Sequence, residues 1–305
     1  MARRSLGCRR VSTPKQAPLM DNNISSRSLV LALVDTEGSL RAGDAFDVGQ
    51  ALGFTPNQIR LTLARLVDDG LLTSTGRGRQ AVLLTTDRYE LLHGPEPEWL
   101  ASAFRQDAGQ APWDGIWRTA SFTLGEDRKR ERNALREVLV GMGAAALMPG
   151  FYVHAVDWNP WLEPAIDQLA VADAVVVSEI ERWRVHGLTE PRAIAAHLWP
   201  LDRIAESYRA FIERFPTVPS PSGDPIAILA RAVDSASAFE FCIRQDPLLP
   251  SELLPDDWPG RGARSILIDA ASLVHTGRTG LGTPRLFTRF DRVIASHRSA
   301  SATIT

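Results

Sequence analysis

TPNQIRLTLARLVDDGLLTSTGRGRQAVLLT, residues 55–85, predicts an amphipathic helix followed by two short strands around an arginine-glycine turn. Thr55 can cap the helix, Pro56 suits the first helical position, and Gln58 completes a capping box. Apolar residues recur at i, i+4, i+7 and i+8, which is the spacing of one buried helix face. This face consists of Ile59, Leu63, Leu66 and Val67.

The opposite face of this helix is polar near its amino end and acidic at its carboxyl end. It collects Asn57, Gln58, Leu61, Ala64, Arg65 and Asp68, with Arg60 and Thr62 on its flanks. Such a face suits a recognition helix that enters the major groove of DNA by its amino end. There Asn or Gln pairs with adenine, Arg meets guanine or phosphate, and Leu61 meets a thymine methyl. The alternative is the polar face of any small helical domain.

The residues before this stretch predict two further helices, at 25–34 and 41–53. Three helices and then a hairpin make the winged-helix order. Arg77 and Arg79 flank Gly78 at the hairpin tip, where they either contact DNA phosphates or the minor groove, or are solvated turn residues. The residues predicted to contact double-stranded DNA are Thr55, Asn57, Gln58, Arg60, Leu61, Arg65, Arg77 and Arg79.

Length and composition predict a soluble protein of two or three domains, with 305 residues, 44% of them hydrophobic and 23% charged. No apolar run reaches the length of about 18 residues that a membrane span needs. The first residues, MARRSLGCRRVSTPKQAP, lack the apolar segment of a signal peptide. We therefore expect a cytoplasmic protein without a membrane partner. Residues 1–90 hold twelve Arg and Lys against nine Asp and Glu, a mild excess that favours a polyanion contact.

Common catalytic and metal-binding motifs are missing from the sequence. The cysteines, Cys8 and Cys242, lie far apart, and the six histidines are scattered. The chain contains no HExxH, CxxC, GxxxxGK[ST] or GxSxG stretch. We therefore expect no enzyme, no catalytic residues and no metal site.

The rest of the chain completes a multidomain α+β prediction. Residues 93–112 are expected to be a linker, and the middle part to form a ferredoxin-like α/β sandwich in which a helix from Asp127 runs through residues 127–147. His154 is interpreted as a packed strand residue. The basic cluster of Arg128, Lys129, Arg130 and Arg132 is either solvated or opposite a phosphate or an acid. The expected divisions are a basic disordered tail 1–24, a winged helix-turn-helix domain 25–92, the linker 93–112, the ferredoxin-like domain 113–188, a C-terminal helical domain 189–275 and a tail 276–305.

Several phrases make the chain resemble the PaaX family of phenylacetate-catabolism repressors, roughly over residues 25–275. They are IRLTLARLVDDGLL, similar to the family's V-R-x-x-L-x-R-L-x-x-x-G-W-L, and WDGIW, LMPGFYV and DPLLPSELLPDDWPG. The chain departs from the pattern at Gly70, Leu71 and Leu72, where the family tends to have G-W-L. It departs again at AVLL, where the family tends to have an aromatic strand, so the wing packing is expected to differ.

The resemblance implies a dimeric transcriptional repressor with a winged helix, a middle domain similar to CRISPR-adaptation nucleases and a family-specific helical domain. It also implies release from the operator by an aryl- or acyl-CoA thioester, with phenylacetyl-CoA as the leading candidate. Trp258, Arg261 and Arg264 are candidate effector contacts, and a packed, solvated loop is their alternative. A metal-dependent nuclease is the alternative function. It needs an acid at the end of the first strand of the middle domain, and Asp127 comes after that strand.

Overall fold

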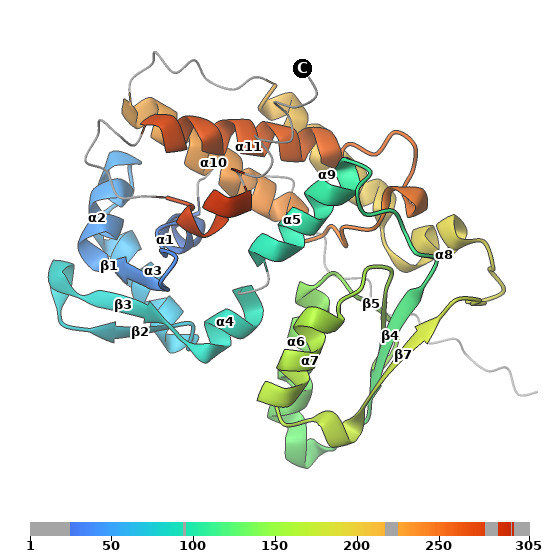
Figure 1. Cartoon of the computed structure of the whole chain (residues 1–305). Helices are drawn as coiled ribbons and strands as arrows, with labels where there is room; N and C mark the ends of the chain where they lie inside the picture. Colours follow the sequence, from blue (N-terminus) through green and yellow to red (C-terminus); the bar gives the residue numbers. More distant parts are fainter. Residues whose placement is uncertain (1–24, 94–95, 217–224, 278–285, 294, 296–305) are drawn as a thin grey trace, which may run out of the picture.

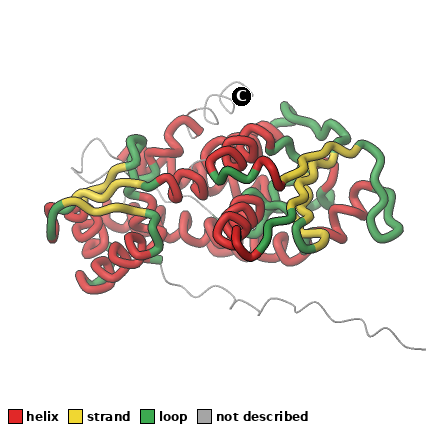
Figure 2. The backbone as a smooth tube through the Cα atoms, turned by 90° about the horizontal axis from the view of Figure 1, so that it is seen from below, coloured by secondary structure: helices red, strands yellow, loops and turns green. Residues whose placement is uncertain are grey.

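The computed structural model describes residues 25–93, 96–216, 225–277, 286–293 and 295. The fold is mixed α+β (Figure 1). A small three-stranded sheet lies at one end of the molecule and a four-stranded sheet toward the other, with helices between them (Figure 2). The basic tail expected at 1–24 lies outside the described residues.

The amino-terminal part combines three helices with an antiparallel sheet of order β1-β3-β2. Its elements are α1 (Ser26–Ala32), β1 (Ser39–Arg41), α2 (Ala42–Ala51), α3 (Pro56–Asp68), β2 (Leu72–Thr75) and β3 (Val82–Thr85). Strand β1 was not expected from the sequence, and the second helix begins at Ala42 rather than at the expected Arg41. Buried Leu40 pairs with Leu83 of β3, so this strand depends on a partner more than forty residues away in the chain.

Helix α3 begins as the sequence predicts. Thr55 accepts a hydrogen bond from the Gln58 backbone, and Gln58 completes the capping box. Ile59, Leu63 and Leu66 are buried, as expected. Val67 is only half-buried. Thr62, expected on a flank, is buried with 8% exposure, and its hydroxyl lies 2.7 Å from that of Ser26 on α1.

The middle part has the βαββαβ order and the sheet order β5-β6-β4-β7 of a ferredoxin-like fold. Its elements are β4 (Trp117–Phe122), α6 (Lys129–Gly141), β5 (Ala145–Met148), β6 (Phe151–His154), α7 (Asn159–Gln168) and β7 (Val175–Ile180). Thr119 of β4 lies opposite Val153 and Ser178 in the antiparallel ladders. Helices α6 and α7 cover one face of the sheet (Figure 1), and the other face packs against the C-terminal helices.

The helix expected over 127–147 is shorter, and a strand follows it. Residues 126–128 form a 3-10 turn, α6 ends at Gly141, and β5 follows. Gly143, between α6 and β5, has a φ of +84°, a conformation that glycine adopts readily. A Cβ there would come within 2.7 Å of Pro247 Cα, so this turn closely contacts the C-terminal part.

The C-terminal part is helical and packs around large aromatic side chains. Its helices are α8 (Pro191–Leu198), α9 (Leu201–Arg214), α10 (Pro225–Ile243) and α11 (Gly260–Gly277). The sequence LDRIAESYRAFIERF predicts a helix that starts at a cap on Asp202 and buries Ile204, Tyr208, Phe211, Ile212 and Phe215. Helix α9 begins at Leu201 instead, and these side chains are buried except Ile212, which is half-buried. No element had been expected from the sequence at the position of α8.

The linker expected at 93–112 is wrong, because most of this stretch is helical. Helix α4 (Asp87–His93) is followed by α5 (Glu96–Asp107), which runs through the centre of the molecule (Figure 1). Trp99 and Ala103 pack in the core under the four-stranded sheet, whereas Leu100 and Phe104 pack with Ile268 and Val293. Helix α5 therefore joins the middle and C-terminal parts by burying two faces.

The tail expected at 276–305 is also wrong in part. Residues 286–293 are packed and include a 3-10 turn at Thr288–Phe290. Leu286 is fully buried in the amino-terminal core, and the Phe287 backbone N–H donates to Ala32 O of α1 at 2.7 Å. The end of the chain thus returns to the first helix.

His154 connects the four-stranded sheet to the loop after α10. It is fully buried, its Nε2 lies 2.8 Å from Pro247 O, and its Nδ1 accepts a hydrogen bond from the Val156 backbone at 2.9 Å. With Nδ1 accepting, Nε2 carries the proton and donates to Pro247. Burial lowers the pKa of His154 to about 4, with the positive charge of Arg118 adding to the shift, and the imidazole is neutral in the folded protein near pH 7.

This histidine predicts a loss of stability in mild acid. The folded state keeps the imidazole neutral to about pH 4, whereas the unfolded chain protonates it near its ordinary pKa of 6.5. The contribution is therefore fully present above pH 6.5. It is lost as the pH falls toward 4, by about 1.4 kcal/mol per unit and about 3 kcal/mol in total.

Denaturant unfolding from pH 8 to 4 measures this effect, with His154→Gln compared against exposed His197→Gln. We expect His154→Gln to be less stable than wild type at pH 8, with the difference shrinking toward pH 4, and His197→Gln to follow wild type. A difference between wild type and His154→Gln that stays constant with pH contradicts the assignment.

Candidate nucleic-acid interface

The outer face of α3 is open to solvent where the sequence analysis placed a DNA-reading surface. Asn57, Arg60, Leu61 and Arg65 are all exposed, and Leu61 is 46% exposed although it is a large apolar side chain. The acidic end, with Asp68 and Asp69, lies at the opposite end of the helix, where Asp69 pairs with Arg27 of α1 at 3.2 Å. The face is therefore most basic and amide-rich in its first two to three turns.

The side chains of this face differ in whether they already form hydrogen bonds within the protein. Gln58 Oε1 accepts from the Thr55 backbone at 2.8 Å and from the Thr55 hydroxyl at 2.9 Å, so both residues hold the helix start. Arg60 donates to the Asn57 side chain. Among the described residues, the Arg65 side chain has neither a hydrogen bond nor an ion pair, which leaves it available to a ligand.

The two arginines of the hairpin tip, which have the same predicted role, lie in different environments. Arg77 is exposed and, within the described chain, unpaired, between Gly76 at φ +88° and Gly78 at φ +60°. Arg79 instead forms an ion pair with Asp47 of α2, and its guanidinium lies 5.8 Å from the Phe46 ring centroid. Arg79 therefore faces α2 instead of projecting from the tip as expected.

The backbone holds the hairpin tip against α2 as well. A Cβ on Gly43 would lie 3.0 Å from Arg79 O, and the Ala42 N–H donates to Ala81 O at 2.9 Å. The sequence predicts a projecting turn at the tip, and no local pattern signals this contact with α2. It requires a glycine on one element to meet a carbonyl on another.

The three candidate effector residues lie in different environments. Arg264 is 4% exposed and forms two hydrogen bonds of 2.7 Å to Asp107, so its guanidinium is already neutralised inside the protein. Trp258 is half-buried, and its indole N–H lacks a partner in the described part of the chain. Arg261 is exposed. Arg264 is thus a structural residue, and the structure does not gather the three into one open site.

Acidic side chains form ion pairs with part of the basic cluster at the start of α6. Arg128 pairs with Asp173 at 2.9 Å, and Arg132 pairs with Glu126 at 2.7 Å. Asp127 is exposed on the 3-10 turn after β4. Across the residues that the structure describes, no group of three or more His, Cys, Asp or Glu is arranged to hold a metal ion.

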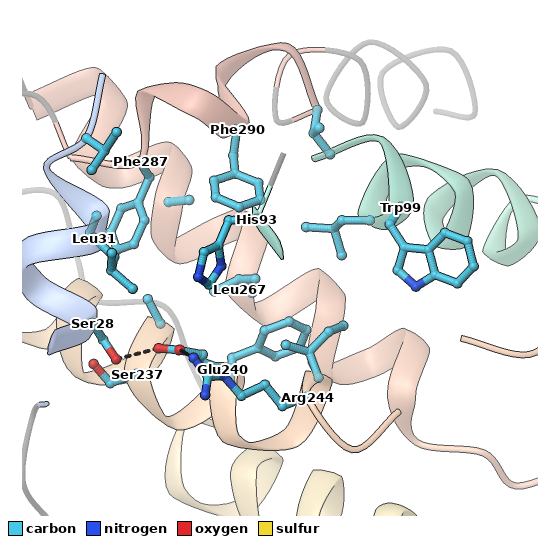
Figure 3. Close-up of a pocket in the computed structure, with 18 of the residues that line it drawn as sticks. Ser28, Leu31, His93, Trp99, Ser237, Glu240, Arg244, Leu267, Phe287 and Phe290 are labelled. Atoms are coloured by element: carbon cyan, nitrogen blue, oxygen red, sulfur yellow. Dashed lines mark hydrogen bonds and ion pairs between the residues drawn. The ribbon is translucent and has the colours of Figure 1, made fainter. Parts of the chain in front are cut away.

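A cavity of about 240 Å³ lies away from these surfaces, and the sequence analysis did not anticipate it. Its walls come from α1, α4, α5, α10, α11 and residues 286–293, and Figure 3 shows how their side chains converge. The lining is mostly apolar and aromatic. Four polar side chains, Ser28, Ser237, Glu240 and Arg244, lie together at one end, and His93 and Asp246 also line the cavity. No sequence motif could have found it, because segments from residue 28 to residue 293 build it.

Two known proteins are similar to this chain. The solved structure of an uncharacterised protein from Mycobacterium tuberculosis is 22% identical, with a TM-score of 0.46, over 84% of this chain and 99% of that one. The transcriptional repressor PaaX of Escherichia coli (strain K12) is 26% identical over 266 residues, which cover 81% of this chain and 79% of the repressor. No helix in the described ranges is long and apolar enough to span a bilayer.

Two domain families account for the middle and the end of the chain. Residues 110–195 match the PaaX protein central Cas2-like domain, and residues 199–278 match the PaaX-like protein C-terminal domain. Together the two matches cover more than half of the 305 residues. The expected resemblance is confirmed, and the chain belongs to the PaaX family.

Proposed function

We propose that this protein is a DNA-binding transcriptional repressor of phenylacetate or related aromatic-acid catabolism, with a winged helix-turn-helix at residues 25–92. The observation that carries the proposal is the exposed face of α3. Leu61 and Arg65 are exposed on this face, and Arg77 is exposed on the hairpin that follows the helix. The relative in Escherichia coli is named a transcriptional repressor, which supports the same class of function.

Helix α3 would enter the major groove by its amino end. Its first N–H groups favour a phosphate, and Arg65 and Arg60 can reach guanine or the backbone. Leu61 offers an apolar surface to a thymine methyl, which explains an exposed leucine on a polar face. Thr55 and Gln58 would contribute mainly by stabilising the start of α3 through their capping hydrogen bonds. Asn57 would read a base after its hydrogen bond with Arg60 breaks.

The hairpin would follow the DNA backbone beside α3. Arg77 is free to meet a phosphate or a narrow minor groove. Arg79 would contribute only after separating from Asp47, and an exposed ion pair of this kind is worth at most about 1 kcal/mol. The two arginines would therefore contribute unequally to binding.

A repressor of this kind would act as a homodimer and respond to a small molecule. Two copies of α3 would read half-sites about 34–36 Å apart, one turn of the double helix. The proposed effector is an aryl- or acyl-CoA thioester, with phenylacetyl-CoA the first to test. A nuclease activity is not proposed, since strand β4 (Trp117–Phe122) carries no acid and Asp127 is exposed on the turn after it.

The first test is binding of the purified protein to the DNA upstream of its own gene, measured by fluorescence anisotropy against salt concentration. We expect tight, specific, salt-sensitive binding that phenylacetyl-CoA reverses. Arg65→Ala should weaken it by about 1 to 3 kcal/mol if the arginine reads a base, with the loss confined to certain base pairs. Arg203→Ala, an exposed arginine on α9, is the matched control and should change nothing. Specific binding that Arg65→Ala leaves intact would remove α3 as the reading element.

The hairpin yields a separate prediction. Arg77→Ala should weaken binding to all sequences and lower the salt slope by about one, because a single phosphate contact is lost. Arg79→Ala should have a smaller effect, since Asp47 already engages that guanidinium. Asp47→Asn should tighten binding by up to about fivefold, the equivalent of one surface ion pair.

A double-mutant cycle separates release of Arg79 from simple loss of a negative charge. If Asp47→Asn tightens binding equally in the presence and absence of Arg79, the ion pair does not restrain the arginine.

A further inference from the structure

The cavity lies between the amino-terminal helices and the C-terminal ones. Leu31, Ala32 and Val34 line it from α1 and the turn that follows, and Phe239 lines it from α10. Figure 3 shows Phe287 and Phe290 along another wall, with His93 and Leu267 between Phe290 and Glu240, and Trp99 farther along. A ligand here would therefore touch α1, which contacts α3, and also the helical C-terminal part of the chain.

The size and lining fit a small aromatic group. A cavity of about 150 Å³ lined by apolar side chains is enough to bind benzene, and drug-sized ligands occupy about 300–1,000 Å³. At about 240 Å³, this cavity has room for an aromatic ring with a short acyl chain. It has no room for a nucleotide as well, so the CoA part of a thioester would have to lie outside.

One polar atom in the lining lacks a partner. The Ser237 hydroxyl oxygen is buried and has no hydrogen bond within the described structure. A buried hydroxyl without a partner is costly, and such groups are uncommon unless something else satisfies them. The carbonyl oxygen of an acyl group could accept the missing hydrogen bond while the ring occupies the apolar part of the cavity.

The same end of the cavity carries a chain of contacts to α3. Ser28 of α1 donates to the Glu240 carboxylate of α10, which is also paired with Arg244 (Figure 3). Two residues before Ser28, Ser26 lies 2.7 Å from the buried Thr62 hydroxyl of α3. Helix α1 is thus held by the cavity wall on one side and by α3 on the other.

We propose that this cavity is the effector site, that it binds the aryl-acyl part of the ligand with its carbonyl on Ser237, and that the ligand alters DNA binding by shifting α1. The proposal rests on the function proposed above. It accounts for an apolar cavity, an unsatisfied hydroxyl and a hydrogen-bonded connection to α3 within one site. A ligand that binds better when α1 is displaced shifts the protein toward that state.

The test uses the full chain and isothermal titration calorimetry with phenylacetyl-CoA, phenylacetate and CoA. Ala271→Phe fills the cavity from α11, and Ser265→Phe places the same ring on the exposed face of that helix. Ser237→Ala removes the unsatisfied hydroxyl, with Ser265→Ala as its control. Because Ser237→Ala deletes a buried group without a partner, it should fold at least as well as wild type.

We expect phenylacetyl-CoA or phenylacetate to bind, and CoA alone to bind far more weakly. Ala271→Phe should weaken ligand binding at least tenfold, and Ser237→Ala about threefold to tenfold, the effect of one hydrogen bond. Both Ser265 variants should match wild type. Each folded cavity variant should still bind DNA, and ligand should no longer release it at concentrations that release wild type.

The possible failures are distinguishable. Ligand binding that neither Ala271→Phe nor Ser237→Ala weakens overturns the cavity as the site, even if specific DNA binding is present, and Ser237→Ala alone decides if Ala271→Phe does not fold. Binding of none of the probes also overturns the proposal. Ligand binding that both variants weaken, in a protein that binds no specific DNA, supports the cavity and refutes the repressor function.

Discussion

The arrangement of the helices depends on the ion pairs and hydrogen bonds of the buried Arg264 guanidinium. It forms two 2.7 Å hydrogen bonds to Asp107 at the end of α5 and lies 3.5 Å from Asp246, which also accepts a hydrogen bond from Tyr208 of α9 at 2.7 Å. Burial raises the pKa of Asp246, and Arg264 opposes that shift. Removing one member of such a buried cluster leaves a charge uncompensated, at a cost of about 3–5 kcal/mol. The cluster thus fixes α5 against α9 and α11, and α5 and α11 are walls of the cavity.

Helices whose own residues carry a capping motif or a regular apolar spacing could be predicted from the sequence. Helix α3 has a capping box and one apolar face, and α9 repeats large apolar residues every three or four positions, so both could be predicted from the sequence. Helix α5 could not, because Trp99 and Leu100 face two different partners and no single apolar stripe results. Strand β1 was missed because its three residues are stabilised by pairing with β3.

The candidate site was predictable as a surface and not as a set of contacts. The exposed positions of α3 follow from helical periodicity, which is why Leu61 and Arg65 were identified. The contact of Gln58 with Thr55 follows from their spacing in the capping box. The ion pair of Arg79 does not follow from any local pattern, because Asp47 lies more than thirty residues from Arg79 in sequence. The cavity is further removed from prediction, since the packed residues 286–293 were expected to be a tail and α5 a linker.

The position of α1 explains how a small cavity could influence a surface as large as a DNA interface. Between the described residues, the polar contacts that hold α1 include a hydroxyl pair to Thr62, a hydrogen bond to Glu240, an exposed ion pair to Asp69 and a backbone hydrogen bond from Phe287. Exposed pairs contribute little, so the apolar packing of α1 carries most of its attachment. The cavity opens within that packing, beside Leu31 and Val34. A ligand that fills the cavity therefore acts on the apolar contacts that hold α1 most strongly, and it can shift α1 only by the difference between its affinities for the two positions of the helix.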